Sequence, residues 1–201
     1  MALLAMAPVG VTHPTHRWRI YRNQRFGTLA EVPDDLFGTA RPADNGDGAT
    51  WTARGGARLR IFGSWNVLEE TPASYDAFLR NGRSGRYASV TYKVTRRDLL
   101  ILSGTHQGMV FYERYAFGDP SGAIHALVLD YPATARSTFD PIVARLSASL
   151  RWTPGRAGER IRRLDQAPRR IPSGPVRQRI RPGSRPGCIV KVGIRHLRLC
   201  S

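Results

Sequence analysis

Cysteine is scarce in this sequence, and both copies, Cys188 and Cys200, lie in its last quarter. A disulfide framework is therefore excluded for the first 187 residues, which fit any redox compartment. No apolar run reaches the ~18 residues that a transmembrane helix needs. Phosphate-binding loops, dinucleotide fingerprints and clustered cysteine/histidine motifs are also missing. The sequence accordingly predicts no cofactor, no metal ion and no membrane span.

Acidic residues are scarce after residue 153. Residues 1–153 hold 18 basic and 13 acidic residues, whereas residues 154–201 hold 13 basic and only two acidic ones. The net charge of +16 therefore divides into +5 and +11, and most of it belongs to the tail. Nucleic-acid binding is predicted only if the tail from Arg156 to Arg198 is a genuine part of the protein.

Composition divides the 201 residues into three segments. Residues 1–16 begin with apolar and small residues, like the later half of a signal peptide that lacks its basic start. The alternative is a disordered N-terminus. Residues 17–153 can form a single domain of ordinary size. Residues 154–201 are rich in Arg, Pro and Gly and predict a disordered tail. Such a tail is either a basic arm or the product of a frameshift or of reading past a stop codon.

The stretch from Arg86 to Tyr131 predicts a meander of four antiparallel strands. Its first run, Arg86 to Thr95, alternates apolar and polar residues with the period of a strand. Two later runs, Leu99–Leu102 and Ala126–Leu129, are continuously apolar, which is typical of strands buried on both faces. Turn residues separate the runs. The sheet must therefore be covered on both sides by helices.

The flanking segments supply two hairpins and two helices. Residues 17–33 and 49–63 predict the hairpins, the second with Gly55 and Gly56 at its tip. Thr71 to Gly82 predicts a helix with a capping threonine, and Tyr75, Phe78 and Leu79 on one face. A second helix is predicted up to Trp152, with Asp140 as its cap. The expected class is α+β: an antiparallel sheet of two hairpins and the meander, covered by helices in an α/β/α sandwich-like arrangement.

This order of elements resembles the Mog1/PsbP-like superfamily. The resemblance rests on Tyr21–Gly27 followed by Val32-Pro33, on the strand Ala57–Ile61, and on the ending Phe139–Leu150. It spans about Trp18 to Trp152 and implies an antiparallel sheet with helices on both faces. Members are mostly non-enzymatic, and uncharacterised exported bacterial members are the most similar. No Ran-binding or photosystem residue set can be matched here.

Candidate functional residues are few. Aromatic residues on strands, with one neighbouring asparagine, could form a ligand or partner surface if they are exposed. These residues are Trp51, Trp65, Asn66, Tyr112 and Tyr115, of which Trp65 and Asn66 are expected to be the more open. For catalysis, His106 lies in a turn without a nearby acid. His125 and Asp130 are five residues apart on one strand, hence on opposite faces.

Three functions follow from these observations. The favoured one is a non-catalytic, exported module, periplasmic or secreted rather than cytoplasmic, that binds a protein or a small ligand. Nucleic-acid binding through the basic tail is the first alternative. A hydrolase that uses His106 or His125 is the second.

Overall fold

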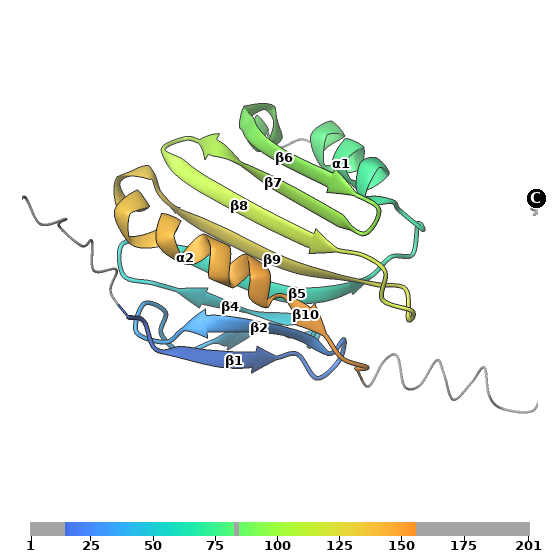
Figure 1. The fold of residues 1–201 in the computed structure, drawn as a ribbon, viewed down its shortest axis with the longest axis horizontal. Helices are drawn as coiled ribbons and strands as arrows, with labels where there is room; N and C mark the ends of the chain where they lie inside the picture. Colours follow the sequence, from blue (N-terminus) through green and yellow to red (C-terminus); the bar gives the residue numbers. More distant parts are fainter. Residues whose placement is uncertain (1–14, 83–84, 156–201) are drawn as a thin grey trace, which may run out of the picture. The chain divides into compact units, whose positions relative to one another are not determined.

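The computed structural model describes residues 15–82 and 85–155. Most of the two predicted terminal segments, residues 1–16 and 154–201, lies outside these ranges. The described residues form two antiparallel sheets, two α-helices and two short 3-10 helices (Figure 1). No helix among them is long and apolar enough to span a bilayer.

The larger sheet has seven strands in the order β3-β4-β5-β9-β8-β7-β6. The bounds of its strands are β3 (Arg41–Pro42), β4 (Gly48–Thr52), β5 (Arg58–Trp65), β6 (Val90–Arg96), β7 (Leu99–His106), β8 (Met109–Ala116) and β9 (Ala123–Pro132). The predicted meander forms β6 to β9, and β5 joins the second hairpin to it by pairing with β9. The tip of that hairpin lies at Gly55 and Gly56, both at positive φ, as predicted.

The first predicted hairpin does not join this sheet. Strands β1 (Trp18–Arg22) and β2 (Thr28–Pro33) form a separate sheet with β10 (Arg151–Trp152). The two sheets touch where Phe26 lies over Gly63 of β5, since a Cβ on Gly63 would come within 2.4 Å of the Phe26 side chain. A larger residue at position 63 would therefore push the sheets apart.

The helices cover opposite faces of the larger sheet, which confirms the predicted α/β/α arrangement. Helix α2 (Arg136–Ser149) buries Phe139, Ile142 and Leu146 in one core cluster, together with the first hairpin. Helix α1 (Pro72–Asn81) packs Tyr75 and Leu79 against the other cluster. Strand β9 contributes Leu127 and Leu129 to the first core and Ala126 and Val128 to the second, as its continuous apolar run predicts.

Two predicted elements have different boundaries in the structure. Residues Gly85–Ser89 form a 3-10 helix, η1, rather than the start of β6, because Arg86 and Tyr87 bond to Glu113 on β8, which β7 separates from β6. Helix α2 begins at Arg136, after the short η2 (Ala133–Ala135), and contains Pro141. It ends at Ser149, so the predicted end at Trp152 is wrong, because Arg151–Trp152 pairs with β2 as strand β10. Asp140 is therefore not its cap but accepts a hydrogen bond from the Tyr131 hydroxyl.

Candidate functional site

An apolar groove lies at the end of β5, between the loop that follows this strand and helix α1. We call it the Trp65 groove. Its volume is about 170 Å³. The lining residues are Ser64, Trp65, Asn66, Val67, Leu68, Glu70, Tyr75, Phe78 and Ile124. The predicted pair Trp65 and Asn66 thus stands at a partly open position, as expected.

The loop that forms one wall of the Trp65 groove is held by Asn66. Its side-chain amide donates to the Glu70 carbonyl and accepts from the Glu70 backbone N–H, both at 2.8 Å. The Asn66 backbone N–H also donates to the Gly122 carbonyl at 3.0 Å. Within this loop Glu69 has φ +53°, a left-handed conformation that is uncommon for a residue other than glycine. The loop therefore has a defined shape, and Asn66 positions it.

Val67 and Leu68 stand at the tip of this loop and point away from the core, because they are 80% and 72% exposed. Phe78 on α1 is 57% exposed. The described residues contain five large apolar side chains that are this exposed, and the other two are Ile20 on β1 and Tyr92 on β6. Three of the five therefore gather at one groove, although scattered single residues are the normal pattern on a surface.

Helix α1 presents Phe78 outward because other residues occupy its inner face. Tyr75 and Leu79 pack into the core, and Asp76 is buried beside them with ion pairs to Arg80 and Lys93 at 2.9 and 3.0 Å. The helix start is fixed by a capping box between Thr71 and Ser74. The sequence prediction placed Phe78 on the buried face with Tyr75 and Leu79, and this placement is wrong.

The other three aromatic residues of the predicted surface are in the core. Trp51 is 1% exposed and packs edge-to-face on Tyr21. Tyr112 is buried with its hydroxyl on Ser147, and Tyr115 is buried with its hydroxyl on Glu113. Each of the three lies on the inward side of its strand. Tyr112 lies under α2, Tyr115 under α1 and Trp51 under the first hairpin, so none of them is exposed at the described surface. Sequence reasoning missed Val67, Leu68 and Phe78. The available signal was the apolar pair Val67 and Leu68 inside an otherwise polar loop.

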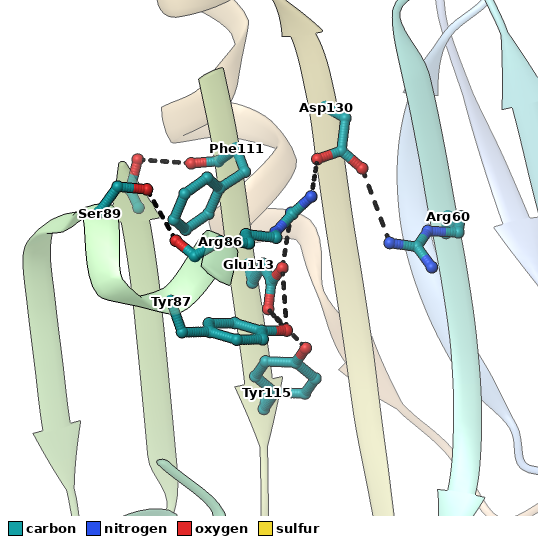
Figure 2. A network of polar contacts seen from close by, with 9 residues as sticks. Arg60, Arg86, Tyr87, Ser89, Phe111, Glu113, Tyr115 and Asp130 are labelled. Atoms are coloured by element: carbon teal, nitrogen blue, oxygen red, sulfur yellow. Dashed lines mark hydrogen bonds and ion pairs between the residues drawn. The ribbon is translucent and has the colours of Figure 1, made fainter. Parts of the chain in front are cut away.

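A second cluster is polar and lies on the face of the large sheet that η1 covers (Figure 2). Glu113 is buried and accepts hydrogen bonds from Arg86 at 2.6 Å, Tyr115 at 2.7 Å and Tyr87 at 3.1 Å. Arg86 also pairs with Asp130 at 2.6 Å. These contacts hold η1 against the sheet.

The charges of this cluster shift the pKa values of its members. Burial, followed by the charge of Glu113, raises the pKa of Tyr87 to about 12 and that of Tyr115 well above its usual value. Burial alone would lower the pKa of Arg86, but Glu113 and Asp130 together outweigh it and raise that pKa. Because these three pKa values are raised, Tyr87 and Tyr115 stay neutral and Arg86 stays charged through the physiological range.

Beside this cluster lies a polar cavity of about 360 Å³ that includes Arg58, His106 and Gln107 in its lining. His106 is the histidine that sequence reasoning considered for catalysis. Among the described residues, the cavity lining contains no serine, threonine or cysteine that could act as a nucleophile for this histidine. A larger hollow of about 630 Å³ lies between β1 and α2, and its rim includes Thr15, where the described residues begin.

His125 has partners that the sequence did not indicate. Its Nδ1 lies 2.8 Å from the Thr28 hydroxyl and its Nε2 lies 3.0 Å from Asp119, and its ring stacks on Trp152. Asp130 faces the opposite side of the sheet, as the odd spacing predicted. The arrangement of hydroxyl, imidazole and carboxylate resembles a catalytic triad. However, Thr28 and His125 have no exposed surface, so a substrate cannot reach the hydroxyl. Burial lowers the pKa of His125, although Asp119 acts to raise it.

Metal ligands do not cluster in residues 15–82 and 85–155, where no group of three His, Cys, Asp or Glu side chains could hold an ion.

No family model and no curated protein matches the chain. Its structure, however, is similar to the solution structure of cyanobacterial PsbP (CyanoP) from Synechocystis sp. PCC 6803. The superposition covers 74% of this chain and 98% of that protein, with a TM-score of 0.50 and 11% sequence identity. The chain has a PsbP-like fold. At this identity the likeness shows the fold alone, and the residues of the PsbP-like body must themselves indicate a function.

Proposed function

We propose that this protein is an exported, non-catalytic module that binds another protein through the Trp65 groove. The observation that carries the proposal is the gathering of Val67, Leu68 and Phe78 around Trp65 on a loop of defined shape. Large exposed apolar patches rimmed by polar residues mark interaction sites in soluble proteins. Aromatic anchors such as Trp65 are the residues that contribute most to binding at such sites.

A protein partner is favoured over a small ligand by the shape of the groove. Its volume of about 170 Å³ is below the roughly 300–1,000 Å³ typical of small-molecule sites. Val67 and Leu68 protrude instead of lining a deep cavity, because most of each side chain is exposed. Protruding apolar side chains suit insertion into a complementary surface of another protein.

The energetic scale is that of a modest, specific contact. Fully burying a Val, Leu or Phe side chain contributes about 1.5–3 kcal/mol, and these three are between 57% and 80% exposed before binding. Each can therefore contribute about 1–2 kcal/mol on binding. Because the loop is already held by Asn66, little ordering cost opposes this gain.

The non-catalytic character of the proposal is supported by the histidines. His125 is buried with its partners, and the described residues that line the cavity beside His106 include no nucleophile. Export is supported by the apolar, small-residue start of the sequence. Fractionation of the native cells, with an antibody against the body, tests export directly. Full-length protein confined to the cytosol would contradict that part.

Crosslinking tests the groove in the native cell. A photoreactive benzophenone amino acid is introduced at Leu68, at Phe78, or at Ile20 as a control of similar exposure on β1. We expect one and the same partner protein to be crosslinked from Leu68 and Phe78 but not from Ile20. Equal crosslinking from all three positions, or from Ile20 alone, would contradict the proposal.

A further inference from the structure

The Trp65 groove is flanked by two acidic residues that form no ion pair with a described residue. Nine of the 13 acidic residues in the first 153 positions form ion pairs among the described residues. Glu69 and Glu70, which follow the apolar loop tip, belong to the four that do not. Arg80 on α1 and Lys93 on β6 are paired with Asp76. Within residues 15–82 and 85–155, the two negative charges at this groove therefore have no ion-pair partner.

We propose that the Trp65 groove binds a protein segment in which apolar side chains stand next to lysine or arginine residues. This inference rests on the proposed function and adds the chemistry of the partner. The apolar side chains contact Trp65, Leu68 and Phe78, and the cationic groups meet Glu69 and Glu70. Charge complementarity of this kind sets specificity and association rate more than affinity.

The backbone of Glu69 supports a role for its side chain. Its φ of +53° is a conformation that glycine adopts without strain and glutamate does not. The same loop would form at lower cost with glycine at this position. Residues in such conformations persist where the surrounding structure holds them, and they cluster at functional sites.

Two other occupants fit the charges less well. A membrane surface with anionic headgroups would be repelled by Glu69 and Glu70. A second copy of this chain, docked through the same groove about a two-fold axis, would bring the two acidic rims toward one another. A partner segment that carries positive charge satisfies both the apolar and the acidic part of the surface.

Peptide binding tests the inference. The probe is a fluorescent synthetic peptide with leucine and phenylalanine beside lysines, compared with a peptide in which glutamates replace the lysines. Full-length protein should prefer the lysine peptide at low salt and lose most of this preference at high salt. Glu69→Gln and Glu70→Gln should each weaken binding of the lysine peptide about threefold. Equal affinity for both peptides would overturn the inference.

Glycine substitution separates the role of the charge from that of the strain. Glu69→Gly should also weaken binding about threefold, while the melting temperature stays unchanged or rises. The matched control is Gln107→Gly, because Gln107 has φ +48° in the β7–β8 turn, away from the groove. It should relieve strain equally and leave peptide binding unchanged. Loss of binding in Gln107→Gly would overturn the inference.

The outcomes distinguish this inference from the proposed function. If Leu68→Ser abolishes binding to the crosslinked partner while both glutamine variants bind normally, the proposed function is supported. The inference that the partner segment is cationic is then wrong. If none of these variants changes binding, both proposals fail. Binding to vesicles of anionic phospholipid, or a concentration-dependent dimer, that is lost in Leu68→Ser would overturn the inference in favour of a membrane or a second copy.

Discussion

Removing either member of the Arg86–Glu113 pair should destabilise the fold strongly. The Glu113 side chain is 2% exposed and that of Arg86 is 21% exposed. When one of the two is removed, water therefore cannot fully solvate the charge that remains. Glu113→Ala leaves Arg86 with Asp130 and removes the acceptor of the Tyr87 and Tyr115 hydroxyls. Truncating one member of a buried pair typically costs about 3–5 kcal/mol.

The double variant should cost less than the sum of the single variants. Once Glu113 is absent, Arg86 has already lost one of its two 2.6 Å contacts to the sheet, so removing Arg86 as well costs less stability than it does in the native protein. We expect an interaction energy of about 1–3 kcal/mol from the double-mutant cycle. Urea denaturation, followed by tryptophan fluorescence, measures the midpoint and slope for the four proteins.

A second cycle serves as the control. Arg145 and Glu31 pair at 2.8 Å, but their side chains are 54% and 26% exposed. Solvent screening should reduce their interaction energy below about 1 kcal/mol. Additive effects at Arg86 and Glu113, or interaction energies that are equal in the two cycles, would refute the reasoning that burial makes the first pair strong.

Three further predictions concern stability, and a fourth concerns nucleic-acid binding by the tail. The folded protein keeps the pKa of His125 below the ordinary 6.5, so the unfolded state binds more protons at acidic pH. The free energy of unfolding should therefore fall as the pH drops below about 6.5. His125→Asn should flatten this slope in urea titrations, and an unchanged slope would contradict the assignment. Leu146→Ala should cost about 2–5 kcal/mol because the side chain has no exposed surface, whereas Val67→Ala should cost under about 0.5 kcal/mol. Ending the chain at Gly155 should preserve the melting temperature measured by calorimetry. Ending it at Leu150 should lower the melting temperature, because β10 is removed. A lower melting temperature in the protein that ends at Gly155 would place the domain boundary later in the chain. If the tail binds nucleic acid, only the full chain should bind at ~50 mM salt.

Local signals carried most of the fold prediction. Helix α1 follows from Thr71 and from the apolar spacing of Tyr75 and Leu79, which act within a few residues of one another. The continuous apolar runs of β7 and β9 correctly indicated helices on both faces. Pairing between β5 and β9, and the separation of the first hairpin into its own sheet, depend on contacts between distant residues, which periodicity does not report.

The site was predicted only in part for a similar reason. Trp65 and Asn66 stand where a strand ends, and turns at strand ends are open to solvent. An aromatic residue within a strand, such as Trp51 or Tyr115, has the same local sequence pattern whether it faces the core or the surface. Only the position of α1 and of the first hairpin decides which side is covered. Phe78 became exposed because Asp76, with its two cations, takes part of the inner face of α1.

The most direct test of the Trp65 groove is the affinity of the crosslinked partner for purified protein. Calorimetric titration should compare the native protein, a Leu68→Ser/Phe78→Ser double variant, and Ile20→Ser as a surface control of similar exposure. We expect the double variant to lose about 2–4 kcal/mol, which is a loss of about thirtyfold or more in affinity. Ile20→Ser should bind like the native protein, and all three should unfold at similar temperatures. A double variant that is folded and binds the partner with native affinity would contradict the account.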